Sequence, residues 1–397
     1  SPPGFGCADA KIFRKGSCTL GLSVGVLKET QPGERRVAIT PKVLDVLSKS
    51  NAEVWIERDA GTESGFADES FSTKGAKIAT RAEVLQHAEV LFTVVPPEPE
   101  TLRKGQVVIG LCDPLGNPQL ADRYAKAGVT LFAMELVPRT TRAQSMDVLS
   151  SMASIAGYKA VLLAASALSR LFPMMTTAAG TIAPARVLVI GAGVAGLQAI
   201  ATARRLGAVV SGYDVRSAVK EQIESLGAKF VNIDIGAAGE GQGGYARQLT
   251  PEEIQKQRDQ MAAVLTEQDV VITTAAVPGR RAPLLVTRDM MKGMQPGTVI
   301  LDMAAQYGGN CEVTKAGETV MQNGVAVIGP VNLPATVPGH ASQMYSRNLV
   351  TFLKNMMTKE GALNIDTNDD IVRDTLVARD GEIVNARVKE LLGAAKS

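Results

Sequence analysis

A short apolar strand that runs directly into a glycine-rich turn constrains this chain more than any other feature. Arg186–Ile190 predicts a buried strand, Gly191-Ala-Gly-Val-Ala-Gly196 follows at once, and a helix is expected over Ala195–Leu206. In such a unit the first glycine permits the tight turn, the second lets a pyrophosphate approach the backbone, and the third allows close packing of helix on strand. The helix N-terminus attracts phosphates. The unit therefore predicts a dinucleotide-binding fold.

An acidic residue after the next strand indicates which dinucleotide is bound. Asp214 ends the strand expected over Ala208–Tyr213, about twenty residues beyond the glycines. Its carboxylate can accept hydrogen bonds from both adenosine ribose hydroxyls, and it repels a 2′-phosphate, so NAD is favoured over NADP. A glycine turn without a ligand is the alternative, but strand, helix and acid together count against it. Arg216 lies close by, and we interpret it as a solvated arginine.

Strands and helices alternate along the chain in two series, which predicts parallel sheets covered on both faces. The first series of strands is expected at Ser23–Leu27, Ala52–Ile56, Val90–Val95, Val107–Leu111 and Val129–Ala133. After a Thr/Ala/Gly-rich link at Thr176–Pro184, the second series continues beyond Tyr213 at Lys229–Val231, Asp269–Thr273, Thr298–Asp302 and Val325–Gly329.

We predict an α/β protein with two Rossmann-like, doubly wound parallel-sheet domains joined by long helices. Residues 23–140 and 340–397 form the first domain, and residues 141–339 form the NAD(H)-binding domain, with a mobile loop at 232–250. The return to the first domain is expected through a helix at His340–Met357. Residues 1–22 show no periodicity and are interpreted as a linker or terminal extension.

Composition excludes several classes of protein. Apolar residues make up 45% of the 397 residues and charged residues 21%, which is typical of a folded globular chain. The 42 basic residues nearly balance the 40 acidic ones, so the net charge of +2 provides no field for a nucleic acid. The four cysteines and two histidines are scattered, so no metal site is expected. No apolar run is long enough to predict a membrane span.

A polar segment, Arg139–Ser151, lies at the predicted junction between the domains. Clefts between domains are common ligand sites, and this segment offers arginine, amide, carboxylate and hydroxyl groups. Alternatively, Gln144, Asp147 and Ser150 only cap and solvate the start of a helix. The spacing alone leaves both interpretations open.

The roles of two further segments are equally open. Lys28–Pro41 places Arg35 and Arg36 just after the first strand, where α/β sheets bind ligands, but an ordinary surface loop has the same composition. Gly236–Tyr245 is long and rich in glycine, which is typical either of a lid over a site or of a solvated linker.

Several motifs resemble, in order, those of the alanine dehydrogenase and transhydrogenase superfamily, and within it the transhydrogenase branch. They are Arg142–Ser151, Ala156–Ala160, Asp214–Arg216, Gly243–Ala246, Pro278–Arg280, Gly308–Cys311 and Asn332–Pro334. The resemblance extends from about Ser23 to the C-terminus. It implies that Gln144, Arg139, Asp147 and Ser150 surround the nicotinamide and its ribose as the catalytic set.

The resemblance also implies a wider set of cofactor-binding residues and several partners. The cofactor-binding set is Gly191, Ala192, Gly193, Val194, Ala195, Gly196, Asp214, Val215, Arg216, Arg142, Tyr245, Ala276 and Val277. Tyr245 corresponds to the tyrosine of a mobile loop that closes over bound NAD(H). The implied assembly is a homodimer that docks an NADP-binding domain and couples to a membrane domain that translocates protons. Such a soluble component lies at the membrane surface, on the bacterial cytoplasmic or mitochondrial matrix side.

The chain departs from alanine dehydrogenase at two positions. That enzyme resembles this chain at Arg36-Val-Ala38. It needs a lysine on the strand matching Leu91–Val95, where this chain has none, and a histidine just after the strand matching Val107–Leu111, where this chain has Cys112. Oxidising an amine moves a proton as well as a hydride and needs an acid–base group, whereas hydride exchange between two nicotinamides needs only positioning. An amino-acid dehydrogenase and a nucleotide-sensing binding protein remain the competing interpretations.

Overall fold

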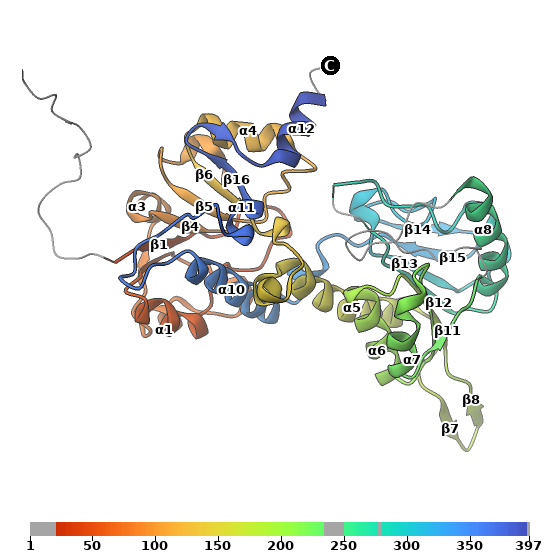
Figure 1. The fold of residues 1–397 in the computed structure, drawn as a ribbon. Helices are drawn as coiled ribbons and strands as arrows, with labels where there is room; N and C mark the ends of the chain where they lie inside the picture. Colours follow the sequence, from red (N-terminus) through yellow and green to blue (C-terminus); the bar gives the residue numbers. More distant parts are fainter. Residues whose placement is uncertain (1–20, 234–249, 277–278, 395–397) are drawn as a thin grey trace, which may run out of the picture.

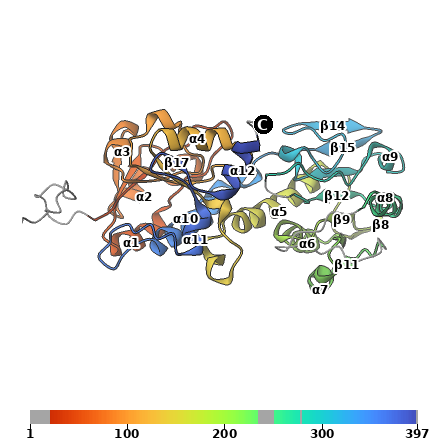
Figure 2. The same cartoon turned by 45° about the horizontal axis from the view of Figure 1, so that its top comes forward.

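A computed structural model shows two α/β domains joined by long helices, and it describes residues 21–233, 250–276 and 279–394 (Figure 1). Each domain is built on one large sheet, and the two sheets lie at opposite ends of the molecule (Figure 2). The doubly wound organisation predicted from the alternating pattern is present in both domains.

The eight-stranded sheet of the first domain has the order β17-β16-β6-β5-β4-β1-β2-β3. Its strands are β1 (Ser23–Val26), β2 (Glu53–Glu57), β3 (Lys77–Ala79), β4 (Val90–Phe92), β5 (Val107–Gly110), β6 (Thr130–Ala133), β16 (Leu376–Arg379) and β17 (Glu382–Ile383). Strands β1 to β6 are parallel, with β1 and β4 adjacent where the winding reverses. Strand β16 adds to β6 in the antiparallel direction.

The seven-stranded sheet of the second domain has the order β11-β10-β9-β12-β13-β15-β14. Its strands are β9 (Arg186–Ile190), β10 (Val209–Tyr213), β11 (Lys229–Phe230), β12 (Val270–Thr273), β13 (Val299–Asp302), β14 (Thr319–Gln322) and β15 (Val325–Ile328). The winding reverses between β9 and β12, the arrangement that binds dinucleotides at the carboxyl ends of the strands. Strand β14 is antiparallel to β15.

Shorter helices cover the faces of both sheets. They are α1 (Pro41–Lys49), α2 (Asp68–Ser72), α3 (Arg81–His87), α4 (Pro118–Lys126), α11 (Asp370–Thr375) and α12 (Ala386–Ala394) in the first domain, and α6 (Val194–Arg205), α7 (Lys220–Ser225), α8 (Pro251–Leu265) and α9 (Arg288–Met291) in the second. The sequence Thr250-Pro-Glu-Glu253 is typical of a capping box, and α8 begins with one: Thr250 accepts from the Glu253 amide, and Glu253 accepts from the Thr250 amide.

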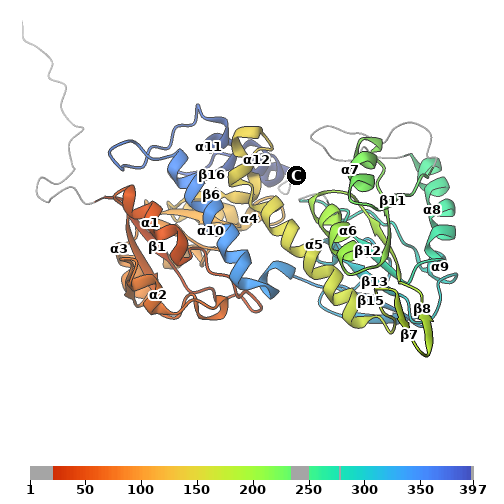
Figure 3. The same ribbon diagram turned by 90° about the horizontal axis from the view of Figure 1, so that it is seen from below.

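Two long helices join the domains, α5 (Val148–Ala167) and α10 (Pro338–Asn355) (Figure 3). Helix α5 packs against α10 of the first domain and, more extensively, against α6 of the second. The approach of α5 to α6 depends on Gly157, because a Cβ atom there would lie 2.2 Å from the carbonyl oxygen of Ala195. The start of α6, where a cofactor's phosphates would sit, is therefore tied to α5.

Helix α5 is long and apolar enough, by length and composition, to cross a membrane. No such segment was expected from the sequence, because Lys159 and several small polar residues interrupt its apolar run. In the structure the apolar side chains of α5 pack against α6, α10 and the short helix η8 (Leu333–Thr336), which accounts for its composition.

The predicted link Thr176–Pro184 is partly a β-hairpin. Strands β7 (Met175–Thr177) and β8 (Gly180–Ile182) pair with each other and project from the second domain (Figure 1). The alternating pattern that marks a half-buried strand is absent here, because both faces of the hairpin are exposed.

Candidate nucleotide-binding site

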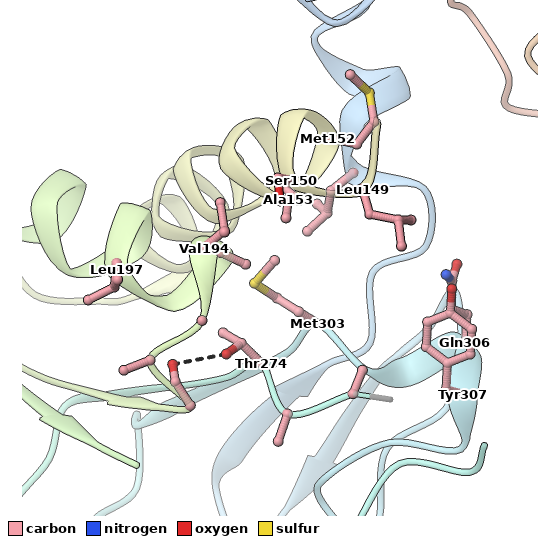
Figure 4. A pocket seen from close by; sticks show the side chains of 18 of the residues that line it. Leu149, Ser150, Met152, Ala153, Val194, Leu197, Thr274, Met303, Gln306 and Tyr307 are labelled. Carbon is pink, nitrogen blue, oxygen red and sulfur yellow. Dashed lines mark hydrogen bonds between the residues drawn. The ribbon is translucent and has the colours of Figure 1, made fainter. Parts of the chain in front are cut away.

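A cavity of about 1700 Å³ opens between the two domains. Residues Gly191 to Ala195 after β9 and Thr274 to Ala276 after β12 line one wall, and the start of α5 lines another (Figure 4). The cavity therefore lies at the carboxyl edge of the second sheet, at the point where the winding reverses. It exceeds the 300–1,000 Å³ or so of an ordinary small-molecule pocket.

The glycine turn has the geometry that a pyrophosphate needs. Gly191 has a φ of +100°, and its carbonyl accepts a hydrogen bond from Thr274 Oγ1 at 3.0 Å (Figure 4). A Cβ atom on Gly196 would lie 1.8 Å from the Gly191 carbonyl oxygen, so the third glycine is required by packing. A Cβ atom on Gly193 would meet nothing within 4 Å. The turn thus leaves open space in front of the α6 N-terminus, and the residues fit a dinucleotide phosphate group.

The side chain of Asp214 is held by Arg216. One carboxylate oxygen accepts from the Arg216 amide and Nε, both at 2.9 Å, and the other accepts from Arg216 Nη2 at 2.9 Å and from the Ala192 amide at 2.8 Å. The interpretation of Arg216 as a solvated arginine is wrong, because its side chain is only 20% exposed and is ion-paired. Burial raises the pKa of Asp214, but hydrogen bonds from Arg216 and Ala192 outweigh it and hold the pKa below its usual value.

Replacing Asp214 with Ala should weaken NADH binding by about 1–2 kcal/mol, because charge-assisted hydrogen bonds to the ribose are lost. The same change releases the Arg216 guanidinium, which can then pair with a 2′-phosphate, so discrimination against NADPH should shrink. Equilibrium titration of both nucleotides against the wild-type, Asp214→Ala and Arg216→Ala proteins measures this. Equal affinities for NADH and NADPH in the unaltered protein would refute the assignment.

The polar segment Arg139–Ser151 reaches the cavity through a short helix, η4 (Thr141–Met146), and the first turn of α5. All four residues of the predicted catalytic set lie along the cavity: Arg139, Gln144, Asp147 and Ser150. Asp147 also caps α5, accepting from the Ser150 amide at 2.9 Å and from Ser150 Oγ at 2.5 Å. The two interpretations left open by the spacing therefore both apply to Asp147, which caps a helix and lines the site.

Arg142 lies apart from the other predicted cofactor-binding residues. It is not among the residues that line the cavity, and its guanidinium pairs instead with Asp369 and Asp370. Ala192, Val194, Val215 and Ala276 do lie along the cavity, whereas Gly196 is packed beneath it. Tyr245 and Val277, with most of the loop predicted at 232–250, lie outside the residues that the structure describes.

The segment after β1 also reaches the cavity. Arg36, which the sequence left open as a ligand or surface residue, is buried and donates from Nε and Nη2 to Glu34 at 2.7 and 2.6 Å. Asn332 donates to the same carboxylate at 2.9 Å. All three residues line the cavity. The group joins the first domain to the loop before η8 and forms a polar wall beside the site.

Several lining residues were not predicted from the sequence. Among them are Gln222, Ile254, Arg258, Met303, Gln306 and Tyr307. Three of them, Met303, Gln306 and Tyr307, follow β13 along the chain and line the cavity (Figure 4). Their position directly after a predicted buried strand, and before the Gly308-Gly309 pair, was an available signal, because residues after parallel strands lie at the ligand edge of the sheet.

The carboxyl groups of two half-buried glutamates lie at the matching edge of the first sheet. Glu29 accepts from the amides of Val94 and Val95 at 2.6 and 3.1 Å, and Glu135 accepts from the amides of Cys112, at 2.7 Å, and Asp113. Burial raises the pKa of each carboxyl to about 7. Neither residue lines the cavity, so both act on the backbone at the strand ends.

Replacing Glu135 with Gln should make the protein more stable at high pH. Glu135 Oε2 is buried without a hydrogen-bond partner. Because its folded pKa lies above the ordinary 4.5, the stability that depends on its proton is present below about pH 4.5 and is lost as the pH rises through 7. Glutamine keeps the accepting oxygen and cannot ionise.

The free energy of unfolding of Glu135→Gln should match that of the wild type near pH 4.5 and exceed it by about 1–3 kcal/mol at pH 8. Denaturant titrations at both pH values measure this difference. Glu89→Gln, which changes an exposed carboxylate that also accepts from a backbone amide, is the control. A variant less stable than the wild type at pH 8 would contradict the account.

Known proteins match this chain over most of its length. The family model "Alanine dehydrogenase/PNT, N-terminal domain" matches residues 25–156, and "Alanine dehydrogenase/PNT, C-terminal domain" matches residues 160–386. The NAD(P) transhydrogenase subunit alpha of Haemophilus influenzae is 43% identical over 366 residues, which cover 91% of this chain and 71% of the relative.

A solved structure and a second enzyme extend the comparison. The transhydrogenase structure from Sinorhizobium meliloti is 44% identical, has a TM-score of 0.84, and aligns with 91% of this chain and 100% of its own. Alanine dehydrogenase of Bacillus subtilis is 28% identical over 94% of this chain and 95% of its own. Identity to these two transhydrogenase chains thus exceeds identity to this alanine dehydrogenase.

Proposed function

The chain belongs to the alanine dehydrogenase and transhydrogenase (PNT) family, and we propose that it is the NAD(H)-binding component of a proton-translocating, Re/Si-specific NAD(P) transhydrogenase. In this proposal it exchanges hydride with NADP(H) held by a separate NADP-binding domain. A separate membrane domain couples the exchange to proton movement. The component works at the membrane surface, on the bacterial cytoplasmic or mitochondrial matrix side.

One observation carries the proposal: among the described residues, the cavity lining offers groups that position a nicotinamide, and its carboxylates are held by arginine or by a helix cap. Within the described part of the chain, its lining contains no histidine, lysine or cysteine. Among the same residues, three carboxylates line the cavity. Glu34 and Asp214 are each paired with an arginine, which holds their pKa below the usual range against the effect of burial, and Asp147 accepts from the amide and hydroxyl of Ser150 as it caps α5. Hydride exchange between two nicotinamides needs no acid–base group, whereas amine oxidation does.

The residues of this chain act by positioning and by excluding water. When bound, NADH supplies a hydride from C4 of its nicotinamide. The α6 N-terminus would hold its phosphates, Asp214 would accept from its ribose hydroxyls, and Gln144 offers an amide that could donate to one nicotinamide and accept from another. Apolar side chains at the cavity, among them Met152 and Met303, limit water (Figure 4). The cavity volume leaves room for a second ring beside the first.

An amino-acid dehydrogenase is less well supported by the same site. The segment where that enzyme needs a lysine, Leu91–Val95, runs from β4 into the loop after it, and the position where it needs a histidine, Cys112, lies just after β5. Thr93 and Cys112 are both buried. A nucleotide-sensing protein, the other alternative, would not need a polar segment that brings arginine, amide, carboxylate and hydroxyl groups together along the cavity.

The β7–β8 hairpin supports the proposed homodimer. Met174, Met175 and Ile182 are 64%, 43% and 50% exposed, although they are large apolar residues. A projecting hairpin with such side chains is suited to packing on a second copy of the chain. Sedimentation analysis of Met175→Glu tests this: a shift toward monomer is expected, and an unchanged mass would count against the hairpin.

A pair of assays separates the three functions. NADH oxidation is followed first with pyruvate and ammonia, and then with a purified NADP-binding domain and an NADP analogue. The proposal predicts turnover only in the second assay. Turnover in the first would identify an amino-acid dehydrogenase, and turnover in neither, with NADH still bound, would favour a nucleotide sensor.

A further inference from the structure

The short helix that carries Gln144 is tied from behind to the C-terminal part of the first domain. Arg142 lies in η4, two residues before Gln144, and it is not among the residues that line the cavity. Its Nη1 donates to Asp369 Oδ2 at 2.9 Å, and its Nη2 donates to Asp369 Oδ1 at 2.6 Å and to Asp370. The guanidinium therefore makes a bidentate contact with the Asp369 carboxylate through both of its terminal nitrogens, a geometry that strongly constrains the arginine.

The acceptor side of this contact is itself held in place. Asp369 caps α11 by accepting from the Ile371 amide at 2.9 Å, and it accepts from Asn355 Nδ2 at 2.9 Å. Hydrogen bonds from Arg142 and Asn355 outweigh burial and hold the pKa of Asp369 well below its usual range. The carboxylate thus stays charged over the pH range in which the protein would work.

A second tether reaches the same helix from α10. The buried Asn348 donates from Nδ2 to the carbonyl oxygen of Ser145 at 2.8 Å. Gln144 lies between the two tethered residues, Arg142 and Ser145, and Asp147 follows and starts α5. The contacts that hold the backbone around Gln144 therefore come from α10 and α11 of the first domain, and not from the glycine turn of the second.

We propose that Arg142, through its pair with Asp369, is a positioning residue that sets the place of Gln144 in the cavity. This inference rests on the proposed function and assigns a role in the hydride step to a residue outside the cofactor contacts. Because small misplacements of reacting groups can lower rates on the order of a hundredfold, a loosened η4 should slow hydride transfer more than it weakens nucleotide binding.

Two variants with a matched control test the proposal. Arg142→Gln removes the charge, and Asp369→Asn removes its partner while keeping a residue that caps α11 well. Arg123→Gln is the control, because Arg123 also bridges two carboxylates, Glu98 and Glu100, and is 47% exposed against 51% for Arg142. Both test variants should lose about tenfold or more in the hydride-transfer rate with an NADH Kd close to that of the wild type. The control should keep the wild-type rate at a similar melting temperature.

A double-mutant cycle distinguishes positioning from general loosening of the fold. If Arg142 acts through Gln144, then Arg142→Gln should slow the reaction little further in a Gln144→Ala background. Additive losses, or a rate for Arg142→Gln equal to that of Arg123→Gln, would overturn the inference. If the wild-type chain transfers no hydride to its partner domain, the proposed function itself is wrong. The failure of this inference and the failure of the proposed function can therefore be told apart.

Discussion

Replacing Gln144 with Asn should slow hydride transfer about a hundredfold while leaving NADH binding nearly unchanged. Asparagine keeps the amide but shortens its reach by one methylene group. If the amide holds two nicotinamides at reactive distance, the shorter side chain leaves at least one ring misplaced. Gln144 is exposed and lies along the cavity, so the fold does not depend on its packing. Stopped-flow measurement of transfer to an NADP analogue, with the partner domain present, gives the rate.

A control separates this effect from a change in affinity. NADH binding should be measured by titration on the same variant, because a loss in Kd would indicate a binding role and not a positioning role. Gln343→Asn, a glutamine of α10 that contacts Lys42 away from the cavity, should retain the wild-type rate. Full activity in Gln144→Asn would show that the polar segment has been assigned the wrong chemistry.

Two glycines of the same turn should give opposite results when each is replaced with alanine. Gly196→Ala should destabilise the fold by about 3 kcal/mol, because its Cβ atom would lie 1.8 Å from a backbone oxygen that no side-chain rotation can move. Gly193→Ala should leave the free energy of unfolding within about 0.5 kcal/mol, because open space surrounds that position.

The same pair should differ in cofactor binding. A methyl group at Gly193 occupies the space through which a pyrophosphate approaches the α6 N-terminus, so Gly193→Ala should bind NADH far more weakly while remaining folded. Thermal unfolding with and without NADH measures both properties, since a ligand that binds only the folded state raises the melting temperature. Strong stabilisation of Gly193→Ala by NADH would contradict the placement of the phosphates.

Elements with strong local patterns were predictable from the sequence. Strand β9 matches its predicted range, Arg186–Ile190, and the start of α8 was marked by Thr250, Pro251 and Glu253. The spacing from the glycines to Asp214 placed the acid beside the turn, where it accepts from the Ala192 amide. In each case the local sequence and the final environment favour the same structure.

Edge elements were less predictable, because their structure depends on distant partners. Strand β16 pairs with β6, although more than two hundred residues separate them along the chain, and its antiparallel direction is set by where α10 and α11 return the chain. Strand β14 and the β7–β8 hairpin carry few buried residues, so hydrophobic periodicity could not mark them.

The two arginines show where site prediction from sequence ends. Arg142 and Arg216 both stand in polar motifs, and both were included in the cofactor-binding set. The structure pairs Arg216 with Asp214 inside the cavity and Arg142 with Asp369 outside it. Asp369 lies far along the chain from Arg142, so only the three-dimensional fold could assign that partner.

The most direct test of the central claim follows the hydride itself. NADH deuterated at both C4 positions would be mixed in ordinary water with the unaltered chain, a purified NADP-binding domain of a transhydrogenase and an NADP analogue. The account predicts that one deuterium appears in the reduced analogue, at a rate nearly flat between about pH 6 and 9, because no group in the cavity must gain or lose a proton. Deuterium released to water, or a bell-shaped dependence of the isolated step on pH, would contradict it.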